Sequence, residues 1–303
     1  MSCRQSEEFS LAFVVPTRNR PDKLEQCLTS LSKQTESHFD VVIIASGNDV
    51  SQIVSRFHEV LEIQYVHSEE PGQIYQRNIG INFLLGKETE YIGFLDDDMV
   101  LDIGAICAIR EFISRKRRNS ERSFGVGLNI VNSSNYRERP FLRVRKLLLR
   151  VGDRPGSVTR SGQNTSIENV HEDVCSDWLG GGYTVWSATI LRQYPQPPSK
   201  TRHAAGEDLI YSYQVGKEYH LYVCSKARLI HQDEPGTGAK NMRYRARKDA
   251  IAHCVFCDQH EELNIALYIA TGFIYHLLLL VLNWMEAIPL CASVNQLFEV
   301  LFV

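Results

Sequence analysis

The sequence predicts an α/β fold with a mostly parallel sheet flanked by helices, and three observations support this prediction. Short apolar runs alternate four times with segments of helical periodicity in the first hundred residues. Such alternation is typical of parallel strands joined by crossover helices. The fourth run, Tyr91 to Leu95, leads directly into Asp96, Asp97 and Asp98. Because ligands bind at the carboxyl ends of strands in open α/β sheets, we expect the functional site there.

The first three strands are expected at the apolar runs Leu11 to Val15, Val41 to Ala45 and Ile63 to Val66. A polar loop, Pro16 to Pro21, is expected after the first of them, and a turn that begins at Ser46 after the second. Each strand precedes a helical pattern. These helices are expected to start at Asp22 as N-cap, at Asp49 or Ser51, and at about Gln73.

Beyond the aspartates the pattern predicts a helix over Ile103 to Arg115 and a strand over Phe124 to Val131. A further helix is expected from Gly206 to Gly216, with two acidic residues in its first turn. Residues Tyr219 to Ile230 are expected to form one or two strands that end at His231. The second half of the chain is therefore also expected to contain both helices and strands.

Composition narrows the class of protein. The chain has 303 residues and a net charge of −3, which argues against a general nucleic-acid binder. Its first ten residues are polar and lack the pattern of a secretory signal, so we expect the protein in the cytoplasm. Eight scattered cysteines are more typical of reduced thiols than of a disulfide framework.

Three consecutive carboxylates repel one another, and a divalent cation would relieve the repulsion. Strand alternation places Asp96 and Asp98 on one side and Asp97 on the other. A cation would then lie between Asp96 and Asp98 or be held by Asp98 alone. Oxygen ligands favour Mg²⁺ or Mn²⁺, which commonly share their coordination with substrate phosphates. The alternative is a solvated acidic loop, and a phosphoryl-transfer site lacks the expected lysine-bearing loop.

Six motifs and a later histidine occur in an order that resembles the family 2 inverting glycosyltransferases of the GT-A fold. They are PTRNRPDKLEQCLTSLSKQ, IIASGND, PGQIYQRNIGI, YIGFLDDDMV, WLGGGY, GED and His231. The resemblance covers roughly Leu11 to Asp249, and its specificity comes from the order of the motifs. We therefore expect a GT-A domain over residues 1–240, with a nucleotide-binding half (1–98) and an acceptor-binding half (99–240). A C-terminal helical extension, residues 241–303, is expected to follow.

The resemblance implies a nucleotide-sugar donor, with uridine as the favoured base, and Mn²⁺ or Mg²⁺ as cofactor. It implies metal ligation by Asp98, Asp96 and His231, although an isolated histidine is more often a packing residue. Donor contacts are expected from Pro16, Thr17, Arg18, Arg20, Ser46, Arg77, Asp96, Asp97 and Arg247. Many relatives have an aspartate after the second strand, where this chain has Ala45-Ser46-Gly47-Asn48, and this departure puts the base in doubt.

Acceptor binding and base catalysis are expected from the second half. Trp178 offers a flat apolar surface for a sugar ring, and Gly180 and Gly181 permit close approach of the backbone to a ligand; the alternative is a flexible turn. By motif position Asp208 is the general base, and Glu207 either orients it or takes its place. Acids at a helix start also occur for capping alone.

Two segments suggest contact with a membrane. Residues Arg137 to Arg160 contain eight Arg and Lys against two acids, and Ala266 to Trp284 is 19 residues without a formal charge. The first is either a solvated loop or a surface for anionic lipid or a phosphate-bearing acceptor. The second is a membrane-lying helix, a homo-oligomer contact or a span. His253, Cys254, Cys257 and His260 have a spacing that would suit a zinc site, but packing of a helix is the favoured interpretation.

The sequence thus favours a metal-dependent inverting glycosyltransferase. It would move a hexose from a nucleotide sugar to a glycan or lipid-linked acceptor in surface polysaccharide synthesis, at the inner face of a membrane, with no nucleic-acid partner. The competing class is a non-catalytic sugar-nucleotide or glycan-binding module that keeps the fold. A nucleotidyltransferase is a third class, and the absence of a glycine-rich, lysine-bearing loop after the first strand argues against it.

Overall fold

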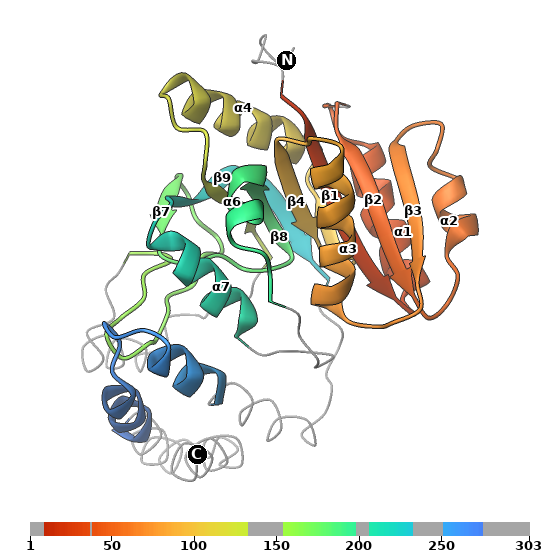
Figure 1. The fold of residues 1–303 in the computed structure, drawn as a ribbon. Helices are drawn as coiled ribbons and strands as arrows, with labels where there is room; N and C mark the ends of the chain where they lie inside the picture. The colour runs from red at the N-terminus through yellow and green to blue at the C-terminus, as the bar shows by residue number, and fades with distance from the viewer. Residues whose placement is uncertain (1–8, 37, 133–153, 198–205, 233–250, 275–303) are drawn as a thin grey trace, which may run out of the picture. The chain divides into compact units, whose positions relative to one another are not determined.

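The computed structural model describes residues 9–36, 38–132, 154–197, 206–232 and 251–274 (Figure 1). The chain divides into two compact units. Unit 1 comprises Met1–Ser133, Ile167–His203 and Tyr211–Asp233, and unit 2 comprises Ser134–Ser166, Ala204–Ile210 and Glu234–Val303. Unit 2 thus groups two internal segments with the C-terminal residues, whereas the predicted boundary at residue 240 kept those segments in the first domain.

Nine strands of the described residues form one sheet in unit 1, in the order β3-β2-β1-β4-β8-β6-β9-β5, with β7 paired to β9. Their bounds are β1 Leu11–Arg18, β2 Asp40–Ser46, β3 Glu62–Ser68, β4 Tyr91–Leu95, β5 Met99–Leu101, β6 Gly125–Ile130, β7 Val174–Ser176, β8 Tyr183–Ser187 and β9 Leu221–His231. Strands β1 to β4 are mutually parallel, and β8 is antiparallel to both β4 and β6. The expected mostly parallel α/β sheet is confirmed.

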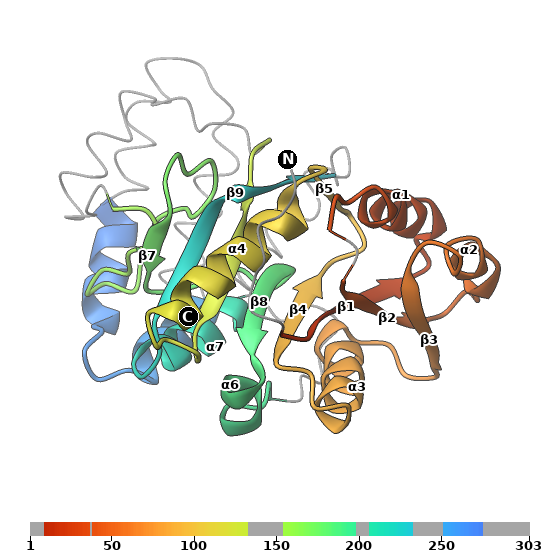
Figure 2. The same ribbon diagram turned by 90° about the horizontal axis from the view of Figure 1, so that it is seen from above.

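Helices cover both faces of this sheet. Their bounds are α1 Pro21–Ser32, α2 Ser51–Ser55, α3 Gln73–Gly86, α4 Ala105–Arg118, α6 Ala188–Gln193 and α7 Glu207–Gly216. Helices α1, α2 and α4 lie on one face, and α3 and α6 lie on the other (Figure 2). The boundary between the two units falls inside α7, between Ile210 and Tyr211.

The first strand and its helix differ from the prediction in two details. Strand β1 continues through Arg18, because Pro16, Thr17 and Arg18 are still in register with β2, so the loop is shorter than expected. Helix α1 has Arg20 rather than Asp22 as its N-cap. Proline at the first helical position explains the shift, since its fixed φ suits that position and its missing N–H costs no bond.

The mixed part of the sheet contains an element that the sequence pattern did not predict. Strand β5 has three residues and pairs antiparallel with the end of β9, with Met99 opposite His231. Strand β9 pairs parallel with β6, but the register shifts between Leu128 and Asn129. This irregularity lets β9 extend as one strand of 11 residues as far as His231.

Unit 2 is described over residues 154–166, 206–210 and 251–274. Residues 251–258 and 265–274 are helical. The zinc reading is wrong, because His253 stacks on Tyr268, His260 packs edge-on against Phe256 and Cys257 is buried. All six cysteines among the described residues are free thiols, as expected.

The structure describes only part of the segments predicted to contact a membrane. Within the described ranges, no helix combines the length and apolar character needed to cross a bilayer. Most of the basic segment, residues 137–153, and residues 275–284 of the apolar stretch lie outside the described residues.

Candidate active site

The loops that follow β1 and β2 are joined directly at the carboxyl edge of the sheet. Arg18 and Ser46, the last residues of the two strands, are register partners. Beyond them, Asn19 accepts a hydrogen bond from the backbone N–H of Asn48 at 2.9 Å. Gly47 has a φ of +81°, and a Cβ there would lie 2.2 Å from the Asn19 side-chain oxygen. Glycine is therefore required for this contact between the loops.

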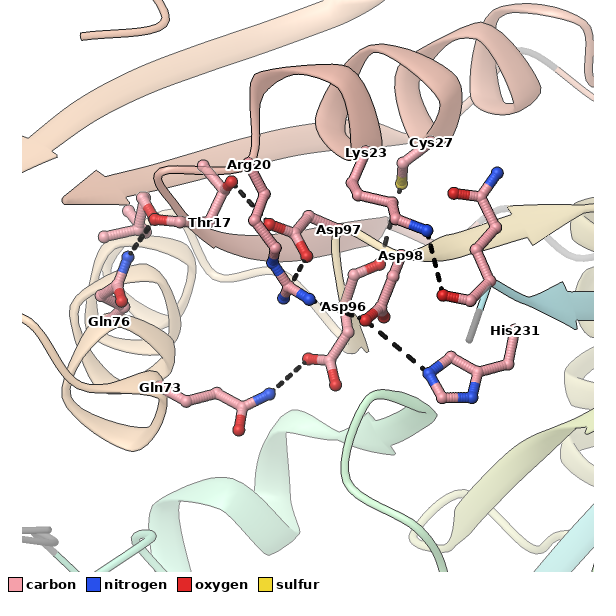
Figure 3. Close-up of polar contacts among 12 residues, drawn as sticks. Thr17, Arg20, Lys23, Cys27, Gln73, Gln76, Asp96, Asp97, Asp98 and His231 are labelled. Atoms are coloured by element: carbon pink, nitrogen blue, oxygen red, sulfur yellow. Dashed lines mark hydrogen bonds and ion pairs between the residues drawn. The ribbon is translucent and has the colours of Figure 1, made fainter. Parts of the chain in front are cut away.

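Asp97 is the most enclosed of the three carboxylates, and its side chain is fully buried. The Thr17 hydroxyl donates to its Oδ2 at 2.6 Å, and Arg20 Nη2 lies 2.5 Å from its Oδ1 (Figure 3). Burial raises the pKa of Asp97 to about 6, although Arg20 and Thr17 favour the ionised form. Its position is that of a carboxylate enclosed within the protein rather than of a ligand open to solvent.

Asp96 turns instead toward α3. Its Oδ1 accepts hydrogen bonds from Gln73 at 2.8 Å and from Arg77 at 2.9 Å. Gln73 and Arg77 are four residues apart, so they project from the same face of the helix. Strand β4 ends at Leu95, and the aspartates lie in a turn closed by the Met99 N–H on the Asp96 carbonyl. The prediction from strand alternation is therefore wrong. The three carboxylates differ in their side-chain neighbours, and only Arg20 among these contacts both Asp97 and Asp98.

Asp98 meets the end of β9. Because Met99 is opposite His231 in the β5–β9 pair, the His231 ring reaches the carboxylate, with Nε2 3.7 Å from Asp98 Oδ2. Arg20 Nη1 donates to the same oxygen at 2.9 Å. Burial opposes ionisation of Asp98, but the nearby His231 ring and the charge of Arg20 outweigh it and lower its pKa. Asp98 is thus an ionised carboxylate beside an imidazole.

These two side chains can serve as ligands of a divalent cation. They supply carboxylate oxygen and imidazole nitrogen, and with 15% and 37% of their side-chain surface exposed they can be reached from solvent. No third His, Cys, Asp or Glu in the described part of the chain joins them in a metal-binding group. A two-residue set suits Mg²⁺ or Mn²⁺, because these ions complete their shells with water and substrate phosphates.

At the ends of β1 and β2, two buried polar atoms have no hydrogen-bond partner among the described residues. Ser46 is 1% exposed, and neither its Oγ nor the Nε of Arg18 has a hydrogen-bond partner among the described residues. Buried polar groups are usually satisfied, so these atoms are suited to a bound ligand. Pro16 is buried within β1, and its contact with the donor stays a prediction.

Two glutamines at this edge were missed by the sequence reasoning. Gln76, 3% exposed, donates to the carbonyls of Thr17 and Ile44 at 2.9 and 2.6 Å and so ties α3 to β1 and β2. Gln73 contacts Asp96, as described above. Both lie in the motif PGQIYQRNIGI, but their periodicity alone does not indicate which of its polar residues point inward.

The glycine-rich segment lies before β8. Trp178 is partly buried against the core, and its backbone carbonyl accepts from Ser176 at 2.5 Å. A Cβ at Gly180 would lie 2.4 Å from the Tyr183 hydroxyl oxygen. The carbonyl of Gly182, which the prediction did not single out, accepts a hydrogen bond from the Asp96 N–H at 2.9 Å. Gly180 and Gly182 thus permit close packing within unit 1, while the acceptor contacts of Trp178, Gly180 and Gly181 stay predictions.

Glu207 and Asp208 occupy the first turn of α7, as predicted. Both belong to unit 2, where Gly206, with a φ of +74°, precedes the helix and accepts from the Ile210 N–H at 3.0 Å. Their role as base and orienting residue stays a prediction. Arg247 lies outside the described residues.

Comparison with known proteins adds family information. A family model described as glycosyl transferase family 2 matches residues 12–159. The chain is 33% identical over 93 residues to an uncharacterized glycosyltransferase of Rickettsia bellii, and 32% identical over 91 residues to glycosyltransferase GlyA of Streptococcus pneumoniae. These alignments cover 30% and 29% of this chain but 13% of each relative, so the matched region is a small part of those proteins.

Solved structures share the fold over most of the chain. S. aureus TarS 1-349 is similar with a TM-score of 0.54 and 15% identity, over 96% of this chain and 90% of that chain. It has also been solved in complex with UDP and with UDP-GlcNAc. GalNAc-T7 with UDP, GalNAc and Mn²⁺ gives a TM-score of 0.57 at 12% identity, over 94% of this chain and 59% of that chain.

Proposed function

We propose that the protein is a metal-dependent inverting glycosyltransferase, because residues 12–159 match the model of glycosyl transferase family 2 and the described sheet has the GT-A fold. The observation that supports it is the turn Asp96 to Asp98, which brings Asp98 beside His231 and Arg20 at the carboxyl edge of the sheet. It moves a hexose from a nucleotide sugar to a glycan or lipid-linked acceptor. The proposed role of this transfer is in surface polysaccharide synthesis.

UDP is the proposed nucleotide. Structural neighbours that bind UDP support it, as do the polar atoms of Ser46 and Arg18 that have no partner among the described residues. Thr17 and Arg20 hold Asp97 and Asp98 in place, and Arg20, with 37% of its side chain exposed, is available to a diphosphate oxygen. The nucleotide therefore lies along the ends of β1, β2 and β4.

Asp98 and His231 are the proposed residues for Mn²⁺ or Mg²⁺. When bound there, the cation supplies charge stabilisation for the diphosphate that leaves the sugar. A GT-A neighbour solved with Mn²⁺ supports the choice of metal. Arg20 supplies a second positive charge at the same carboxylate, at 2.9 Å from Asp98.

Asp208 is the proposed general base, with Glu207 as the residue that orients it. Displacement by a hydroxyl that one base deprotonates inverts the anomeric carbon. Both carboxylates lie in the first turn of α7, where the helix dipole favours negative charge. Trp178 and the following glycines are the proposed acceptor surface, because an aromatic face suits the C–H face of a sugar.

We also propose contact with the inner face of a membrane. The exposed side chains of residues 265–274 are apolar, with Ile265, Leu267, Phe273 and Ile274 between 37% and 43% exposed. A helix with such a face lies on a bilayer or on a second copy of the chain. Sedimentation with lipid vesicles, compared with the oligomeric state in solution, distinguishes the two partners.

The proposed function is tested by transfer. A panel of nucleotide sugars, incubated with the protein and Mn²⁺ and read by mass spectrometry, should give transfer or slow hydrolysis of a UDP-sugar. NMR of the transfer product should show the inverted anomeric configuration. A binding module would release no UDP. Asp208→Asn should then lower the transfer rate by about 10²–10⁴ and leave donor binding nearly intact, because only the proton acceptor is lost.

Glu207→Gln is the matched control for the base. If Glu207 only orients its neighbour, this change should cost less than Asp208→Asn. An inactive Glu207→Gln beside a near-normal Asp208→Asn would reverse the two roles. Full activity of both variants would contradict the proposed inverting mechanism at this helix.

A further inference from the structure

Asp96 is held on three sides by groups that do not themselves belong to the proposed metal site. Gln73 and Arg77 both donate to its Oδ1, at 2.8 and 2.9 Å (Figure 3 shows the Gln73 contact). Its backbone N–H donates to the carbonyl of Gly182 at 2.9 Å. A Cβ at Gly182 would lie 2.0 Å from Asp96 Oδ2, so the carboxylate packs directly against that glycine.

Burial of the Arg77 side chain carries a free-energy cost, because its guanidinium is charged. Arg77 is 1% exposed, and a buried guanidinium must be paired with an anion to be tolerated. Its anion is Asp96, and the guanidinium also lies over the Phe94 ring at 5.8 Å, on the strand that leads into the turn. The pair therefore fixes both the end of β4 and the first carboxylate of the turn.

The turn transmits this position to Asp98. The carbonyl of Asp96 accepts a hydrogen bond from the Met99 N–H at 3.1 Å, and only two residues lie between them. The carbonyl of Asp98 accepts a hydrogen bond from the Gln232 N–H at 2.9 Å. A displaced Asp96 would move the whole turn, because its short backbone ring cannot absorb the change. Asp98 would then lose its position beside His231.

We infer that Gln73 and Arg77 are positioning residues that act through Asp96 to set the place of Asp98, and that Gly182 is small so that Asp96 can occupy this position. This inference rests on the proposed function. It separates the aspartates by task, since Asp96 anchors the turn from α3 while Asp98, with His231, faces the cation. It replaces the expectation that Asp96 is itself a metal ligand.

The test is calorimetry of MnCl₂ titrated into the full chain in the presence of UDP, with no transfer required. Partners that hold a metal ligand in place typically contribute about 10–100-fold in metal affinity. Gln73→Leu should weaken the apparent Mn²⁺ affinity about tenfold and Arg77→Met by up to about 100-fold. Arg77→Lys should restore part of the loss, because it returns the charge without the planar fork.

Arg110→Met is the matched control for loss of a buried arginine. Arg110 is 6% exposed and donates to the carbonyls of Phe9 and His38, away from the turn. The Arg110→Met variant should have a lower melting temperature than the parent, as Arg77→Met should, but an unchanged Mn²⁺ affinity. Gly182→Ala should weaken Mn²⁺ about tenfold, whereas Gly104→Ala, whose Cβ would meet nothing within 4 Å, should not.

The outcomes are separable. Mn²⁺-dependent UDP binding in the parent chain, with affinity lost in Gln73→Leu and Gly182→Ala but kept in the two controls, supports the inference. If the parent binds and Gln73→Leu and Gly182→Ala bind equally well, the inference is overturned while the proposed function stands. If the parent shows no Mn²⁺-dependent binding of UDP, the proposed function is overturned, and the inference with it.

Discussion

The two halves of the sheet contribute differently to the candidate site. The parallel half, β3-β2-β1-β4, supplies the charged groups, because the turn after β4 bears all three aspartates and the helix after β1 is preceded by Arg20. The mixed half, β8-β6-β9-β5 with β7, supplies the His231 ring and the backbone of Gly182. The parallel half thus provides the carboxylates and the side chains that hold Asp96, and the mixed half adds one imidazole and one backbone carbonyl.

The difference follows from strand direction. Parallel strands end at the same edge, so their loops gather polar residues there, and the Thr17–Asp97 and Arg77–Asp96 contacts lie wholly within the parallel half. Antiparallel β5 reverses the chain immediately after the turn and pairs with β9, which brings a single side chain to Asp98. We therefore expect the largest loss of binding from removal of a carboxylate in the parallel half, and a smaller loss from substitutions in the mixed half.

Asp98→Ala is the largest effect that we predict. It removes the carboxylate that faces His231, and the remaining aspartates are held by Thr17, Arg20, Gln73 and Arg77. Mn²⁺-dependent UDP binding should fall by more than about 100-fold, since even the partners of a metal ligand contribute 10–100-fold. Calorimetry with UDP and Mn²⁺ measures it, and unchanged affinity would exclude Asp98 as a ligand.

Asp102→Ala is the control for this change. Asp102 follows β5 in the same stretch of chain and pairs with Arg228 at 3.3 Å, with 43% of its side chain exposed. An exposed pair contributes at most about 1 kcal/mol to stability. The variant should bind UDP and Mn²⁺ like the parent, and a loss equal to that of Asp98→Ala would point to a general electrostatic effect.

His231→Ala should have a smaller effect, about tenfold in Mn²⁺ affinity, because water can take the place of one ligand. The backbone should stay in place, since Asn132 bonds both the N–H and the carbonyl of His231 at 2.9 and 2.7 Å. His220→Ala, just before the same strand, removes a histidine that pairs with Glu121 and should leave metal affinity unchanged. Equal loss in both variants would refute the ligand role.

The parallel half was largely predictable from the sequence. Its strands are continuous apolar runs bounded by polar loops, and β4 was predicted at the bounds observed. Local periodicity is sufficient for such elements because each strand is buried on both faces. The three aspartates, Thr17, Ser46 and Arg77 were accordingly expected at this edge, and the structure brings them there.

The mixed half was harder to predict. Strand β5 has three residues, and β9 shifts its register against β6, so neither gives a regular alternation. The pairing of Met99 with His231 joins residues more than a hundred positions apart, and no local pattern encodes it. For the same reason, helical spacing alone could not predict that Gln73 and Arg77 both donate hydrogen bonds to Asp96.

The smallest effect that we predict concerns the stability of the mixed half. Asp173 Oδ1 accepts from the backbone N–H and hydroxyl of Ser225, at the irregular part of β9, and Arg115 Nη2 lies 2.5 Å from its Oδ2. Burial opposes ionisation, but these bonds from Arg115 and Ser225 outweigh it and lower the pKa of Asp173. A carboxylate with a lowered pKa in the folded state stabilises the fold above its unfolded pKa, and the contribution is lost as pH falls through the folded value.

Urea unfolding of the parent and of Asp173→Asn tests this prediction. At pH 7 the parent should be more stable by less than about 1 kcal/mol, since the Arg115 pair is largely exposed. The difference should shrink below about pH 4, near the ordinary pKa of an aspartate, because the parent then loses the same charge. UDP and Mn²⁺ affinity at pH 7 should be equal in the two proteins, since Asp173 supports the mixed half away from the turn. A stability difference that does not change with pH would mean that the charge of Asp173 does not contribute. A loss of Mn²⁺ affinity in Asp173→Asn would show that residues of the mixed half other than His231 and Gly182 also influence the metal site.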